Sequence, residues 1–226
     1  MIEMLCSIDH RFNEKLMTEI ETNLHKFGMT VANVENGSQF IHMTFAEYFA
    51  AQRLVEILQH PNEHPIQLFE FVLQRVLVDA GFKVVRSFIN ASLELKVGQE
   101  DENLNGTQRH HQATETTYSL LNQAMHCIAE EGHGNLTRWI IHNYCKDETD
   151  AEQLLKPNKD GQTPVYIAAE EGEVEVVNAF VNCDKFTPAE LLKPNKDGKT
   201  PVDVASGNYR DEILELLSSA GKEPKL

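Results

Sequence analysis

A duplicated segment places the strongest constraint on the fold of this chain of 226 residues. The octapeptide LLKPNKDG occupies residues 154–161 and again residues 191–198, and each copy continues with one variable residue and then Thr-Pro-Val. Thr163 of the first copy and Thr200 of the second are 37 residues apart. A fixed period of this length predicts a stack of repeated helical units, because one such unit is too small to bury its own apolar face.

The residues of one unit indicate a turn followed by two short antiparallel helices. The turn ends at Gly161, which can adopt a positive φ without steric cost. Thr163 is typical of a helix N-cap, and Pro164 is typical of the first helical position. Gly172 predicts the end of the first helix. The apolar face expected for the second helix consists of Val174, Val176, Val177 and Phe180.

The unit resembles a known repeat family. Residues 160–172, DGQTPVYIAAEEG, are similar to the ankyrin pattern D-G-x-T-P-L-H-x-A-A-x-x-G. A diverged copy at residues 123–133 keeps the family histidine as His126, where Tyr166 and Asp203 stand in the other copies. The third copy has Tyr209 in place of the glycine between its helices, and an apolar segment typical of a terminal cap follows. The resemblance implies a mainly α fold with a stack of three ankyrin-type repeats over residues 117–226.

The spacing of the copies is wider than the ankyrin period. It is 37 residues between the duplicated segments and 40 residues between Gly132 and Gly172, compared with roughly 33 in ordinary ankyrin repeats. The sequence Thr187-Pro-Ala-Glu190 has the form of a capping box. We therefore expect an additional helical turn between the repeats.

The first part of the chain, residues 1–95, is predicted to form a small helical, winged-helix-like domain with one β-hairpin. Apolar residues recur at near-helical spacing over residues 8–27, and Asn36-Gly37 between two apolar runs predicts the hairpin. A capping box that begins at Thr44 opens a helix that Pro61 ends. Two further helices are expected over residues 65–80 and 82–95.

Residues 40–51, FIHMTFAEYFAA, resemble the F-x-H-x-[ST]-F-x-E-[FY]-x-A-A signature found late in NACHT-type NTPases. The resemblance implies that His42 contacts the phosphates of a bound nucleotide, whereas a histidine packed locally between hairpin and helix is the alternative. The glycine-rich phosphate loop that such an NTPase needs does not occur in the sequence. We therefore predict no enzyme activity and no cofactor, and we keep a nucleotide-sensing remnant or fragment of a NACHT-ankyrin signalling NTPase as the alternative function.

No other residues in the sequence indicate a catalytic or metal site. Residues 96–116 are polar and are predicted to be a linker, so His110 and His111 lack a third ligand at fixed spacing for a metal ion. Cys127 lies beside His126 but falls in the expected inner helix, where a small packed residue is typical. The four cysteines form no C-x-x-C pair, which indicates reduced thiols and a cytoplasmic protein.

The charge and hydropathy of the chain restrict its partners. A net charge of −15 repels nucleic acid and anionic membranes, and an acidic surface that only maintains solubility is the alternative interpretation. No run approaches the ~20 apolar residues that span a bilayer, and the N-terminal residues lack the pattern of a signal peptide. We therefore expect neither a nucleic-acid nor a membrane partner.

The predicted function is a non-catalytic protein–protein interaction module. The ankyrin resemblance implies that turn tips and inner helices form the binding surface. The tip positions are Asn158, Lys159, Asp160 and Gln162 in one turn and Asn195, Lys196, Asp197 and Lys199 in the next. The inner-helix positions are Glu130, Glu131, Glu170 and Glu171. These glutamates suggest an acidic groove that favours a Lys/Arg-rich segment of a partner protein, and a solvated acidic face is the alternative.

Overall fold

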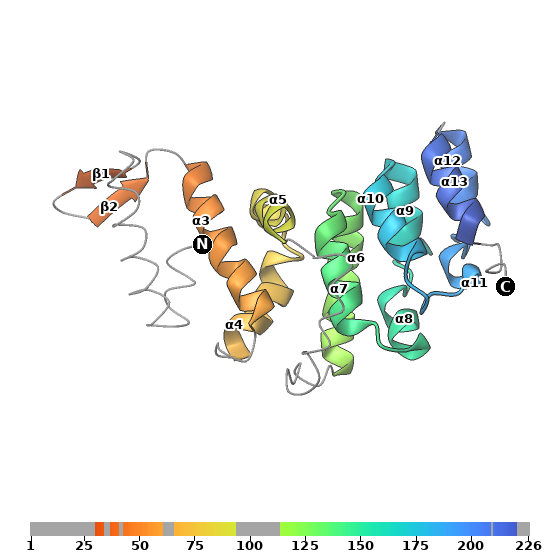
Figure 1. The fold of residues 1–226 in the computed structure, drawn as a ribbon, viewed down its shortest axis with the longest axis horizontal. Helices are drawn as coiled ribbons and strands as arrows, with labels where there is room; N and C mark the ends of the chain where they lie inside the picture. The colour runs from red at the N-terminus through yellow and green to blue at the C-terminus, as the bar shows by residue number, and fades with distance from the viewer. Residues whose placement is uncertain are drawn as a thin grey trace. The chain divides into compact units, whose positions relative to one another are not determined.

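The chain divides into two compact units, Met1–Ser92 and Leu93–Leu226, and each is described by itself. The computed structural model describes residues 30–33, 37–40, 43–60, 66–93, 114–208 and 210–220, shown as coloured ribbon in Figure 1. The helix predicted over residues 8–27 and the residues His42, His110, His111 and Tyr209 lie outside the described residues. Most of the predicted linker lies outside them as well.

The first unit contains the predicted hairpin. Strand β1 (Thr30–Asn33) pairs antiparallel with β2 (Gly37–Phe40), and the register joins Thr30 to Phe40 and Asn33 to Gly37. The pairing ends at Asn33 and Gly37, and Gly37 belongs to the Asn-Gly dipeptide that predicted a hairpin. The hairpin prediction is therefore confirmed.

The helices of the first unit form one apolar core. Helix α3 (Met43–Gln59) packs against α5 (Lys83–Ser92), and α4 (Ile66–Phe71) contacts α3. Among the apolar side chains that α3 and α5 bury almost completely are Ala51, Leu54, Ile57, Val85 and Ile89. Helix α3 begins one residue before the capping box that predicted it. The helix predicted over residues 65–80 is instead interrupted, because α4 passes into the π-helix η2 (Val72–Val76), which the 3-10 turn η3 (Ala80–Phe82) follows.

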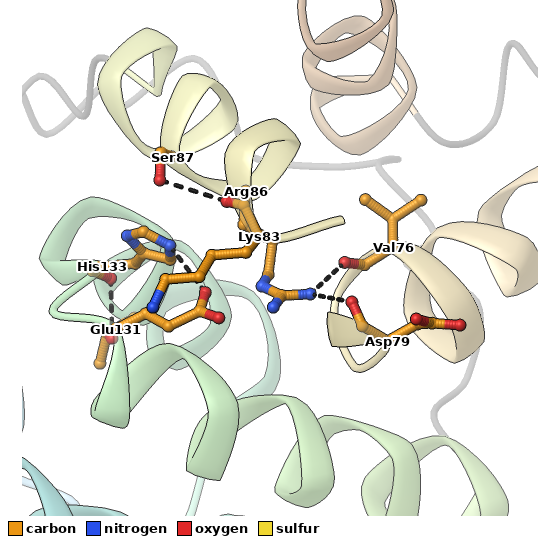
Figure 2. A network of polar contacts seen from close by, with 8 residues as sticks. Val76, Asp79, Lys83, Arg86, Ser87, Glu131 and His133 are labelled. Atoms are coloured by element: carbon orange, nitrogen blue, oxygen red, sulfur yellow. Dashed lines mark hydrogen bonds and ion pairs between the residues drawn. The ribbon is translucent and has the colours of Figure 1, made fainter. Parts of the chain in front are cut away.

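The buried Arg86 of α5 holds this interruption in place (Figure 2). Its Nη1 atom donates hydrogen bonds to the carbonyl oxygens of Val76 at 2.9 Å and of Asp79 at 2.7 Å. The end of a helix leaves carbonyl groups without backbone partners, and a charged donor satisfies them well. Asp79 also caps η3, since its Oδ1 atom accepts from the amide of Gly81 at 2.9 Å. One arginine thus joins η2, η3 and α5.

In the second unit, the described residues form three pairs of helices, which follow one another in Figure 1 from green to blue. The pairs are α6 (Glu115–Glu130) with α7 (Gly134–Tyr144), α9 (Pro164–Glu171) with α10 (Val174–Val181), and α12 (Pro201–Gly207) with α13 (Asp211–Ala220). The first helices pack in the order α6, α9, α12, and the second helices pack in the order α7, α10, α13. The predicted fold class, a mainly α stack of repeated helix pairs with a preceding helical unit, is correct.

The stack begins slightly earlier than the sequence predicted. Helix α6 begins at Glu115 instead of after residue 116, because Thr114 and Thr117 form a reciprocal cap. The amide of Thr117 donates to the Thr114 hydroxyl at 3.2 Å, and the amide of Thr114 donates to the Thr117 hydroxyl at 3.3 Å. Two threonines therefore perform the task that a threonine and a glutamate perform in the usual capping box.

Two short helices between the repeats account for the wide spacing. Helix α11 (Pro188–Leu191) confirms the extra turn, with the Thr187 amide donating to Glu190 Oε2 at 2.8 Å. Helix α8 (Glu148–Leu154) was not predicted, although Asp147 caps it through the amide of Asp150 at 2.9 Å. Helix α8 packs on α6, and the hydroxyl of Tyr118 donates to the Asp150 carboxylate. Burial and this carboxylate together raise the pKa of Tyr118.

The glycine between the two helices of a repeat serves both its own turn and the next repeat. Gly172 has a φ of 89°, and Gly132 has a φ of 73°. A Cβ atom at Gly172 would overlap the guanidinium group of Arg210, and a Cβ atom at Gly132 would overlap the carboxylate of Glu173. In both cases the overlapping side chain comes from the following repeat, so these glycines allow successive repeats to approach closely.

Three glycine-to-alanine variants separate the cost of the positive φ from the cost of the close approach. Gly207 lies in α12, and a Cβ atom added there would have no neighbour within 4 Å. Gly207→Ala should therefore leave the free energy of unfolding unchanged or raise it by about 0.5–1 kcal/mol. Gly198→Ala, with a φ of 78° and no such neighbour, should lose about 1 kcal/mol. Gly172→Ala should lose more than Gly198→Ala, because the side chain of Arg210 must also move. Urea unfolding measures all three, and equal values for Gly172→Ala and Gly198→Ala would contradict the role of the close approach.

Candidate functional site

The two duplicated turns have the same internal hydrogen bonds. In the first, the amide of Asn158 donates to the Gln162 carbonyl at 2.9 Å, and Asn158 Oδ1 accepts from the amides of Asp160 at 2.9 Å and Gln162 at 3.0 Å. In the second, Asn195 Oδ1 accepts from Asp197 and Lys199 at 3.0 Å each. The side-chain oxygens of Asn158 and Asn195, which the sequence assigned to partner binding, are therefore occupied in building the turns.

The side chains at the tips of these turns face solvent. The exposed tip residues are Lys159, Asp160, Lys196, Asp197 and Lys199. The amide of Lys196 donates to the carbonyl of Asp160 at 3.2 Å, so the two tips are adjacent. Gln162 differs, since its side chain is half-buried and bonds to Asn158 Nδ2 at 3.1 Å and to Glu170 Oε2 at 3.2 Å. The tips thus present charges of both signs on a backbone that is already fixed.

In the first two repeats, the position of the family histidine connects the repeat to the turn that follows it. The Nε2 atom of His126 lies 3.1 Å from the carbonyl oxygen of Gln162, in the first duplicated turn. Tyr166 occupies the same position in the second repeat, and its hydroxyl accepts from Asn195 Nδ2 at 3.0 Å, in the second duplicated turn. The three residues at this position were recognised in the sequence, but the role that His126 and Tyr166 share required the structure.

Asp203, at the same position of the third repeat, is bonded differently. Its carboxylate accepts from the amide of Thr200 at 2.8 Å and from the Thr200 hydroxyl at 2.7 Å. These hydrogen bonds hold the pKa of the Asp203 carboxyl below its ordinary value. Asp203 therefore caps its own helix instead of contacting a further turn.

The four inner-helix glutamates do not share one environment. Glu130 and Glu171 are exposed, whereas Glu170 accepts from Gln162 at 3.2 Å. Glu131 lies 3.0 Å from the Nε2 atom of His133, a contact that Figure 2 also shows. Since Gly132 corresponds to Gly172, the exposed Glu130 and Glu171 occupy different positions in their repeats. The acidic groove predicted from four stacked glutamates is thus reduced to two open carboxylates.

Two cysteines that the sequence did not connect lie together. Cys145 follows α7 and Cys183 follows α10, and their thiols are hydrogen-bonded to each other. The bond from Cys145 lowers the pKa of Cys183 to about 7, and the same bond raises the pKa of Cys145. The two residues are 38 positions apart, so no local motif indicated the pair.

The described part of the chain offers no other site of obvious chemistry. No group of three or more His, Cys, Asp or Glu residues in it could hold a metal ion. None of the helices described here has both the length and the apolar character to cross a membrane. Cys127 is half-buried in α6.

Comparison with known proteins identifies the repeated units. Residues 124–226 match the family model of ankyrin repeats in three copies. No curated protein and no solved structure gives a significant match to the chain. The family match does not extend to residues 1–95, whose resemblance to NACHT-type NTPases stays a prediction.

The hydroxyl of Tyr166 provides a test of the link between a repeat and the following turn. Tyr166→Phe removes the acceptor for Asn195 Nδ2 and should lower the free energy of unfolding by about 1 kcal/mol. The backbone amides of Asp197 and Lys199 should then exchange hydrogen faster.

Tyr118→Phe is the matched control for this variant. It removes a hydroxyl that bonds to Asp150 and to the Tyr144 carbonyl, both outside the duplicated turns. Its effect should therefore fall on α8 and not on the turn of Asn195. Unchanged exchange at Asp197 and Lys199 in Tyr166→Phe would contradict the proposed link.

Proposed function

Because residues 124–226 contain three ankyrin repeats, we propose that this part of the chain is a non-catalytic module that binds another protein. Ankyrin repeats support protein–protein interaction in general, whereas the surface and the partner are specific proposals. The observation that carries the proposal is the pair of duplicated turns with exposed tips. Asn158 and Asn195 fix the backbones of these turns through identical hydrogen bonds.

A fixed turn favours binding because little conformational entropy is lost when a partner docks. The hydrogen bonds of Asn158 and Asn195 hold each duplicated turn in place before any partner arrives. The exposed charges at the tips are then free to select the partner, since their own backbone is already satisfied. We therefore assign the direct contacts to Lys159, Asp160, Lys196, Asp197 and Lys199, and a positioning role to Asn158, Gln162 and Asn195.

The acidic side of the proposed surface favours a basic segment of the partner. Glu130 and Glu171 are exposed on α6 and α9, and the whole chain carries a net charge of −15. Glu131 and Glu170 contribute less, because each already has a partner within its own unit. Attraction to a Lys/Arg-rich segment would act mainly through these open carboxylates and would weaken with salt.

A cytoplasmic location fits this proposal. The four cysteines of the chain have no spacing typical of a disulfide framework. Partners that expose basic segments would then be proteins of the same reducing compartment.

Selection of ligands from a library of protein segments tests the binding surface directly. With the full chain as target, the selected segments should be rich in Lys and Arg, and their affinity should fall as salt rises. The variant Glu130→Gln with Glu171→Gln should weaken binding by about two- to five-fold for each charge removed. The matched control is Glu148→Gln with Glu152→Gln, which removes two exposed charges of α8 outside the proposed surface.

Two outcomes would count against the proposal. Selected segments without basic residues, bound equally well at low and high salt, would exclude the acidic surface. Failure of the chain to select any segment would count against a binding module altogether.

The alternative, a nucleotide-sensing remnant of a NACHT-type NTPase, is supported by the motif at residues 40–51 alone. If His42 contacts a nucleotide, millimolar ADP should raise the melting temperature of the chain, and His42→Ala should abolish the increase. An equal melting temperature with and without ADP would remove this alternative.

A further inference from the structure

The two thiols that face each other lie at equivalent ends of stacked helices. Cys145 ends α7, where its amide donates to the Ile141 carbonyl at 2.9 Å. Cys183 follows α10, where its amide donates to the Phe180 carbonyl at 3.2 Å. Helices α7 and α10 pack against each other as the second helices of successive repeats (Figure 1). The thiol contact therefore joins one repeat to the next.

Contacts at the opposite ends of the same helices fix how α7 and α10 pack. Arg138 of α7 pairs with Glu175 of α10. A Cβ atom at Gly134 would lie 2.6 Å from the Cβ atom of Glu175, so the two backbones approach closely there. Because the helices are held at their N-terminal ends and the cysteine backbones are hydrogen-bonded, the thiols meet without further ordering of the chain.

The two sulfur atoms differ in access and in charge environment. Cys145 is 8% exposed, whereas Cys183 is half-buried and open to small reagents. The Cys183 sulfur accepts a hydrogen bond from Cys145 and another from the backbone of Lys185, and both lower the pKa of Cys183. The Lys185 ammonium lowers this pKa as well, whereas the Asp184 carboxylate raises it. Asp147 and Asp150 face Cys145 and oppose its ionisation. The pKa of Cys183 is thus lowered and that of Cys145 is raised, and the more accessible Cys183 is the sulfur that reacts first with a small reagent.

We propose that Cys145 and Cys183 form a reversible disulfide that fastens the first repeat of the stack to the second. The oxidant is a peroxide. The Cys183 thiolate attacks a peroxide oxygen, the O–O bond breaks, and the departing hydroxide takes up a proton to become water. The resulting sulfenic acid is attacked by the Cys145 sulfur, the S–OH bond breaks, and the leaving hydroxide takes the Cys145 proton as a second water. Two thiols lose two electrons and the peroxide gains them.

The bond would close a loop that contains α8, α9 and α10. A cross-link across 38 residues restricts the unfolded chain much more than the folded one, in which the sulfur atoms are already neighbours. Oxidation should therefore raise the free energy of unfolding of the second repeat without changing the structure of its turns. This inference depends on the thiol geometry and not on the proposed partner.

Mild oxidation of the full chain with hydrogen peroxide tests the proposal. Peptide mapping by mass spectrometry should find Cys145 joined to Cys183 with a loss of two hydrogen atoms, and dithiothreitol should reverse the change. The melting temperature of the oxidised chain should rise by roughly 5–15 °C over the reduced chain. Mapping separates this product from any that involves Cys6 or Cys127.

Variants show whether the two thiols act as a pair. In Cys145→Ala, alkylation of Cys183 at pH 7 should slow by roughly ten-fold, because the donor that favours its thiolate is gone. Cys127→Ala should change neither the alkylation rate of Cys183 nor the disulfide, and melting of the reduced variants checks that they fold. Oxidation that joins Cys183 to a second chain or to Cys6, or that converts it to sulfinic acid while Cys145 stays a thiol, would overturn the proposal.

Discussion

Contact between successive helix pairs is the interaction on which the second unit depends. A first helix such as α9 is too short and has side chains too small on its packed side to form a core by itself. In α9 the side chains of Val165, Ala168 and Ala169 have no exposed surface, and the helices that cover them are α6 and α12. The second helices follow the same rule, since Ile140, Phe180 and Ile213 are buried one after another along α7, α10 and α13. The stability of the second unit therefore comes mainly from the contacts between successive repeats and not from single repeats.

The polar contacts between repeats depend on the order in which the repeats stack. His126 and Tyr166 each reach forward to the turn of the next repeat, and Glu173 and Arg210 each reach back over a glycine of the repeat before. Neither set of contacts could form if one repeat were reversed. The position of the family histidine thus helps to specify the order of stacking, whereas Asp203 at the same position caps its own helix.

The sequence predicted those features that local chemistry determines. Glycine, proline and threonine at fixed offsets predicted the turns, the N-caps and α11, since each residue acts within one turn of the chain. The sequence did not predict α8, whose cap is a single aspartate in a polar region, or the π-helix η2, which depends on the distant Arg86. The partners of Glu131 and Glu170 and the pairing of Cys145 with Cys183 also escaped prediction. These contacts join residues whose approach is decided by how helices stack, which composition and spacing alone do not specify.

The near-identity of the two turns has a consequence for how such a chain can lengthen. A tandem copy of residues 164–200, inserted after Thr200, would bring its own Tyr166 and its own acceptor turn. Each copied tyrosine would face a copied Asn195, and the glycine of the original second repeat would be covered by the copied Glu173, as Gly132 is covered now. The junction with α12 would be kept, and the new junction, between the original α9 and its copy, would reuse these two contacts. Duplication of this 37-residue segment is therefore an evolutionary step that the existing interfaces can accommodate, so the number of repeats can change while the chemistry of each junction is inherited.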